Sequence, residues 1–184
     1  LQNAYNTNEH FVLKDPRLCI LLEGIIPCLV DSLLQLDFLL ILRSPVEVVM
    51  SLCKAEEISP YDALNLWIGS VFRAECSSRP YSRNILTYYQ LISRPQTILD
   101  SFGLNWNQSF MESRLDQATS FLRPSLYRTK VDNVRESFVA TNPELTSLLE
   151  LAEEIFDCFQ HATPDIASIS ERLNYQWVEI LAGR

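Results

Sequence analysis

The sequence predicts a three-layer α/β domain with a parallel sheet of at least three strands and a helical C-terminal third. Three observations predict this class. Short apolar runs alternate with segments of helical periodicity in the N-terminal half of the chain. The run Phe38–Leu42 is apolar at every position, as in a strand covered on both faces. After Asn142, apolar residues recur at helical spacing.

The composition is that of one ordinary globular domain, which we place over residues 1–184. The chain has 184 residues, of which 47% are hydrophobic and 21% are charged. Its formal charge of −8 argues against a broad nucleic-acid surface, but not against one small basic pocket for an anion. No apolar run without a charged residue approaches the roughly 20 residues that span a bilayer, so we predict no membrane span.

Cysteine and histidine usage predicts a cytoplasmic protein without a metal site. The five cysteines are odd in number and widely spaced, which favours free, buried thiols over a disulfide framework. The two histidines, His10 and His161, are too far apart in sequence to indicate a His-based metal site.

The first part of the chain predicts two strands separated by helix. Phe11–Leu13 is a short apolar strand that ends before a proline. The apolar stretch 17–36 contains Gly24 and Pro27, which predict a break into two short helices. The range 37–43 then contains the second strand.

Two helices are predicted from the same start pattern, a serine followed by proline and, two residues later, an acidic residue. Ser44 and Glu47 mark the first helix, which runs to about residue 55. Ser59 and Asp62 mark the second. In each, the serine is the expected N-cap, and in the first helix Glu47 completes a capping box. The second helix has an apolar stripe that we interpret as core, formed by Leu64, Trp67, Ile68 and Val71.

The third strand and the remaining helices complete the prediction. Asn84–Tyr88 contains the third strand, and 95–102 reads as a helix stopped by Gly103. Two further helices start near Asn142 and Asp165. Their apolar positions share one face in each helix: Leu145, Leu148, Leu149, Ala152, Ile155, Phe156 and Phe159 in one, and Ile166, Ile169, Leu173 and Ile180 in the other.

Polar residues lie at the ends of all three predicted strands. Ligands of open parallel sheets bind outside the carboxyl ends of the strands, so this edge is the expected site. Arg43 follows the second strand and Tyr88 ends the third; Lys14, Asp15 and Arg17 follow the first.

Arg43 is the strongest candidate for binding an anion. It lies just before a helix N-terminus, where the free N–H groups and the helix dipole already favour negative charge. Ser51 lies almost two turns after Ser44, on nearly the same helix face. Together the guanidinium and the hydroxyl can hold a phosphate. The alternative is structural: Ser44 is a cap, Ser51 an exposed hydroxyl, and Arg43 the partner in a surface ion pair.

Four segments, in order, resemble the sulfotransferase family. The segment from Arg43 to Ser51 resembles the family's 3′-phosphate-binding motif. The others resemble elements of a bacterial sulfotransferase group, and they are Val12-Leu13-Lys14-Asp15-Pro16-Arg17-Leu18, Ala63-Leu64-Asn65-Leu66-Trp67 and Leu86-Thr87-Tyr88-Tyr89-Gln90-Leu91. The resemblance implies a P-loop-like fold and the co-substrate 3′-phosphoadenosine 5′-phosphosulfate, with no metal.

The resemblance also implies a reaction and roles for three residues. A sulfuryl group would pass in line to a hydroxyl or amine of a small-molecule or glycan acceptor. Arg43 and Ser51 would bind the 3′-phosphate, and Lys14 would be catalytic by neutralising charge on the leaving phosphate. The alternative for Lys14 is an ion pair with Asp15 or another carboxylate.

The sequence departs from the family at the 5′-phosphosulfate-binding loop. This glycine-containing loop normally precedes the Lys-Asp-Pro-Arg segment, yet residues 1–10 contain no glycine. We therefore expect a chain that lacks its N-terminal strand, loop and helix, and that is incomplete or inactive alone. The alternative is a catalytically incomplete interaction or assembly domain, with a partner domain or as an oligomer. A nucleotide kinase fragment fits less well, because the Arg–Ser pair does not suit it.

Overall fold

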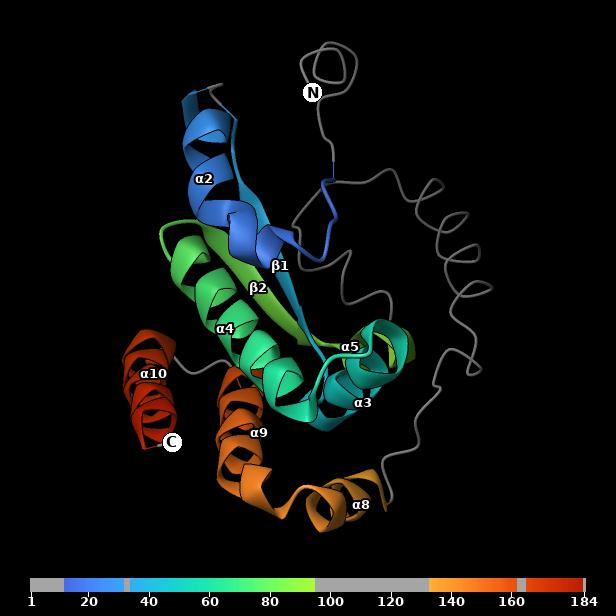
Figure 1. The fold of residues 1–184 in the computed structure, drawn as a ribbon. Helices are drawn as coiled ribbons and strands as arrows, with labels where there is room; N and C mark the ends of the chain where they lie inside the picture. The colour runs from blue at the N-terminus through green and yellow to red at the C-terminus, as the bar shows by residue number, and fades with distance from the viewer. Residues whose placement is uncertain (1–11, 32–33, 95–132, 162–164, 184) are drawn as a thin grey trace.

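The computed structural model describes residues 12–31, 34–94, 133–161 and 165–183. Figure 1 shows helices gathered around two strands that lie side by side. In chain order the elements are α2 (Leu18–Asp31), β1 (Asp37–Leu42), α3 (Pro45–Glu56), α4 (Pro60–Ser78), β2 (Ser82–Thr87), α5 (Tyr88–Ser93), α8 (Val134–Thr141), the 3₁₀ turn η3 (Pro143–Leu145), α9 (Thr146–Gln160) and α10 (Ile166–Ala182). The protein is therefore α/β and mostly helical, and the described part of its C-terminal third is helical as predicted.

The two strands form a parallel pair, with a register that runs from Asp37 opposite Ser82 to Leu42 opposite Thr87. Strand β1 and strand β2 match the second and third predicted strands. The described part of the first predicted strand forms no strand: Val12 and Leu13 are irregular and 83% and 46% exposed. Apolar residues favour a strand because their side chains pack on a half-buried sheet surface, and exposed residues lack this packing. The sheet of the described residues thus has two strands and not the three predicted.

Helix α2 is continuous, and the prediction of two short helices was wrong. It passes through both Gly24 and Pro27 without a break. A proline inside a helix removes its own N–H donor and crowds the carbonyl four residues before it, but tertiary packing can outweigh this cost. Helix α2 packs along α4. The two buried side chains of α2, Leu22 and Ile26, precede Pro27 and hold this part of the helix in place.

The two predicted serine caps behave differently. Ser59 caps α4 as expected: its Oγ accepts a hydrogen bond from the backbone N–H of Asp62 at 3.1 Å and donates one to the Asp62 carboxylate at 2.6 Å. Ser44 occupies the N-cap position of α3, but its side chain makes no capping hydrogen bond. The predicted capping box at Ser44 is therefore absent, because the Glu47 carboxylate bonds Arg43 instead.

We expect this difference to appear in the stabilities of two alanine variants. Ser59→Ala removes a capping hydrogen bond and should lower the free energy of unfolding by about 1 kcal/mol. Ser44→Ala removes none and should change it by less than about 0.5 kcal/mol. Urea denaturation of the two variants and the wild type measures both values. Equal losses in the two variants would contradict the structural difference between the caps.

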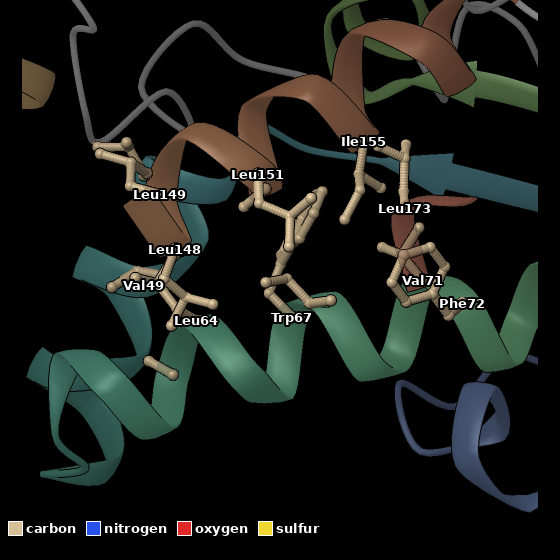
Figure 2. Packing of buried hydrophobic residues seen from close by; sticks show 14 of the residues in the cluster. Val49, Leu64, Trp67, Val71, Phe72, Leu148, Leu149, Leu151, Ile155 and Leu173 are labelled. Carbon is tan, nitrogen blue, oxygen red and sulfur yellow. The ribbon is translucent and has the colours of Figure 1, made fainter. Parts of the chain in front are cut away.

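The main core lies where α9 packs on α3 and α4. Figure 2 shows Leu148 of α9 beside Val49 of α3 and Leu64 of α4, all three fully buried. Trp67 continues the same stripe of α4 and is buried, as predicted for a core residue. This packing fixes α3 relative to α4, and so fixes the end of β1 that precedes α3.

A second buried centre is ionic and was not predicted. The Glu75 side chain of α4 is fully buried and is bound by two arginines. Arg79 donates from Nε and Nη2 to both carboxylate oxygens at 2.9–3.1 Å, and Arg83 of β2 donates from Nη1 to Oε1 at 3.0 Å. Arg79 also donates to Glu171 of α10 at 2.9 Å. We call these four residues the Glu75 cluster; it joins α4, β2 and α10.

Several expectations about other features can be compared with the described residues. The five cysteines are free, but none is fully buried, and Cys28 and Cys76 are exposed, so the prediction of buried thiols was wrong. Cys28 is exposed because the apolar helix α2 buries only one side. No helix within the described ranges has the length and apolarity needed to cross a membrane. The helix predicted over 95–102 lies outside the described residues.

Candidate functional site

Arg43 and Tyr88 lie together at the carboxyl edge of the sheet. The last residues of the two strands, Leu42 and Thr87, are opposite each other in the parallel register. The residues that follow them are therefore neighbours, and the Arg43 guanidinium carbon lies 4.9 Å from the centre of the Tyr88 ring. A cation over a tyrosine face is attracted by the negative face of the ring. This is the edge at which the sequence predicted a ligand site.

The Arg43 side chain is held by a buried carboxylate. Its Nε donates a hydrogen bond to Oε2 of Glu47 at 2.8 Å, and the two side chains are 25% and 5% exposed. The Arg43 backbone is fixed as well, because Trp67 Nε1 donates to its carbonyl oxygen at 3.2 Å. Arg43 is thus oriented by residues of α3, α4 and α5 together.

The first turn of α3 adds partial positive charge to the same place. Ser44 makes no capping bond to this helix, so its own N-cap side chain does not occupy the first N–H groups. The neighbouring helix α5 differs, since Thr87 and Gln90 close its N-terminus with a complete capping box. Helix α3 therefore begins without a side-chain cap, whereas α5 is capped at its start.

Ser51 is exposed on α3 and forms no direct bond with Arg43. Arg43, Glu47 and Ser51 follow one another at intervals of four residues; Glu47 and Ser51 share one face of α3, and Arg43 precedes the helix by two residues. Glu47 therefore lies between the two residues predicted to share a phosphate. The sequence reasoning took Glu47 for a capping residue and missed its bond to Arg43, although an Arg–Glu spacing of four was a signal for it.

Lys14 is exposed in the irregular segment before α2. Among the described residues, no hydrogen bond or ion pair links it to Arg43 or Ser51. Asp15, its suggested alternative partner, is bound instead by Arg17, which donates from Nε at 3.0 Å and from Nη2 at 2.7 Å. The side-chain hydrogen bond from Arg17 lowers the pKa of Asp15, with smaller help from the Arg17 backbone N–H.

The described part of the chain contains no group of three or more His, Cys, Asp or Glu side chains arranged to bind a metal ion. Comparisons with protein-family models, with curated proteins and with solved structures find no match to this chain.

Proposed function

We propose that this chain is the 3′-phosphate-binding part of a sulfotransferase that uses 3′-phosphoadenosine 5′-phosphosulfate. It would transfer a sulfuryl group to a hydroxyl or amine of a small-molecule or glycan acceptor. Arg43 and Ser51 bind the 3′-phosphate, and Lys14 is the candidate catalytic residue. The proposal rests on the sequence motifs together with the surroundings of Arg43.

The observation that carries the proposal is the position of the Arg43 guanidinium. It lies at the carboxyl edge of two parallel strands and at the uncapped start of α3. The Glu47 bond uses Nε, so the two terminal nitrogens of the guanidinium form the fork that suits a phosphate. A guanidinium, a hydroxyl and helix N–H groups are the usual donors to such an anion.

The proposed chemistry needs a cation near the leaving group. As the sulfuryl group departs, negative charge grows on the bridging oxygen of the nucleotide phosphate, and a nearby ammonium lowers that barrier. Lys14 has this role in the proposal. Lys14 lies in the irregular segment before α2, and its position next to the bound co-substrate is part of the proposal.

Calorimetric titration of the chain with adenosine 3′,5′-bisphosphate tests the binding step. We expect wild-type binding, a loss of at least about tenfold in Arg43→Ala, and a smaller loss in Ser51→Ala. Arg43→Ala also leaves the buried Glu47 carboxylate without its partner, so a loss of binding in this variant combines the lost contact with an unpaired buried charge. The same substitution is therefore repeated with Glu47→Gln, which removes the buried charge.

Ser82→Ala is the matched control for Ser51→Ala. Ser82 is an exposed serine at the amino end of β2, at the opposite end of the sheet from Arg43. Its replacement should leave the affinity unchanged. Absence of wild-type binding at millimolar ligand, or the same affinity in the wild type and all four variants, would overturn the proposal.

A second function is favoured by the exposed apolar residues. Val12, Leu21 and Ile41 are all exposed in the described structure, although each belongs to an apolar run of the sequence. Exposed apolar side chains are available for contact with a partner, although scattered ones also occur on monomeric proteins. A catalytically incomplete interaction or assembly domain is therefore the alternative, and sedimentation analysis that finds a stable oligomer without nucleotide binding would favour it.

A further inference from the structure

The Glu47 side chain is a buried carboxylate whose described bond is to one nitrogen of Arg43. It is 5% exposed, and its Oε2 accepts the Arg43 Nε–H at 2.8 Å. Burial of a carboxylate lowers stability by desolvating its charge unless the carboxylate is paired. The bond to Arg43 therefore offsets the desolvation of Glu47. A glutamate three residues after an N-cap often completes a capping box. Glu47 has no such role here, because α3 has no side-chain capping bond.

The bond from Glu47 acts on the orientation of the guanidinium. An arginine loses considerable rotational freedom when it binds a ligand, and a side chain that is already fixed loses less. Glu47 holds the inner edge of the guanidinium through Nε, while the Tyr88 ring lies against its face at 4.9 Å. With one edge and one face held, the terminal nitrogens are left to meet a ligand.

We infer that Glu47 is a positioning residue, which fixes the Arg43 guanidinium so that its terminal nitrogens meet the 3′-phosphate. This inference rests on the proposed function. The competing role is inhibitory: the Glu47 carboxylate, which already bonds Arg43, would then compete with the phosphate for the guanidinium. When Glu47 is replaced by a residue without charge or acceptor, the positioning role predicts weaker binding of the 3′-phosphate and the inhibitory role predicts tighter binding.

The test compares the affinities of two ligands that differ by the 3′-phosphate. Adenosine 3′,5′-bisphosphate carries the 3′-phosphate and adenosine 5′-monophosphate lacks it, so the ratio of their affinities reports on the 3′-phosphate contact alone. General damage to the fold lowers both affinities and leaves the ratio unchanged. Calorimetry measures the ratio for the wild type and for Arg43→Ala, Glu47→Leu and Glu47→Gln.

We expect Glu47→Leu to lower the ratio about tenfold, towards the value in Arg43→Ala, because leucine fills the space without accepting a hydrogen bond. Glu47→Gln keeps an oxygen that accepts the Nε–H bond and should restore the ratio to within about threefold of the wild type. Glu56→Leu is the control, since Glu56 is an exposed residue of the same helix. It should leave the ratio unchanged.

The outcomes separate the inference from the function on which it rests. If the wild type does not prefer the bisphosphate, the proposed function fails. If the wild type prefers it and Arg43→Ala removes the preference, the function stands. In that case an unchanged ratio in Glu47→Leu overturns the positioning role, and a raised ratio shows that Glu47 competes with the ligand.

Discussion

Replacing Glu75 with alanine is expected to lower the free energy of unfolding by about 3–5 kcal/mol, a large part of the stability of a domain of this size. The carboxylate is fully buried and accepts hydrogen bonds from both Arg79 and Arg83. Its removal leaves two guanidinium groups, 26% and 17% exposed, without the charge that they surround. The measurement is urea denaturation of the variant and the wild type at neutral pH.

Glu154→Ala is the matched control. Glu154 of α9 accepts a hydrogen bond from Arg172 of α10 at 3.0 Å, but these side chains are 45% and 53% exposed. An exposed pair of this kind contributes about 1 kcal/mol or less. The two variants therefore compare the same type of ion pair inside and outside the protein. If Glu154→Ala and Glu75→Ala lowered the free energy of unfolding by similar amounts, the burial of Glu75 would not be the reason for its large contribution.

The sequence contained a signal for the Glu75 cluster. Glu75 lies four residues after Val71 and so continues the apolar stripe of α4, where a charged residue is out of place unless it is paired. Arg79 and Arg83 follow at intervals of four. The link to Glu171 was beyond prediction, because it depends on how α10 packs and joins residues 92 positions apart.

The candidate site was predictable where it depends on local pattern and strand direction. Two parallel strands that end opposite each other bring Arg43 and Tyr88 together, and this followed from the predicted sheet. The serine caps show the limit of local pattern. Ser44 and Ser59 begin the same motif, but the acidic residue after Ser44 has an arginine within reach and bonds it instead. A local sequence motif does not show which of two possible hydrogen-bond partners an acidic side chain will take.

The apolar run at the first predicted strand shows a different limit. Val12 and Leu13 have strand-like composition, yet they are exposed and irregular. Strand preference is mostly a preference for a half-buried, paired position, so the composition alone does not create the strand. The Lys14 prediction depended on that strand, and its role in transfer stays a prediction.

The Glu75 cluster also predicts how stability depends on pH. Burial by itself raises the pKa of the Glu75 carboxyl, but hydrogen bonds from Arg79, Ser170 and Arg83 outweigh it, and the pKa is lowered below the ordinary value of 4.5. The unfolded chain then binds a proton at a higher pH than the folded protein does. The stabilisation is therefore complete above the unfolded pKa and is lost as the pH falls through the folded pKa.

Glu75→Gln isolates this effect, because it keeps the shape of the side chain and cannot titrate. At pH 7 the wild type should be clearly more stable than the variant, and the difference should narrow as the pH is lowered from about 5 towards 3. Urea denaturation of both proteins across that range gives the difference directly, and other acidic groups contribute equally to the two. A difference that stays constant with pH would mean that the Glu75 pKa is the same in the folded and unfolded states. The arginines would then stabilise the carboxylate no more than its burial destabilises it.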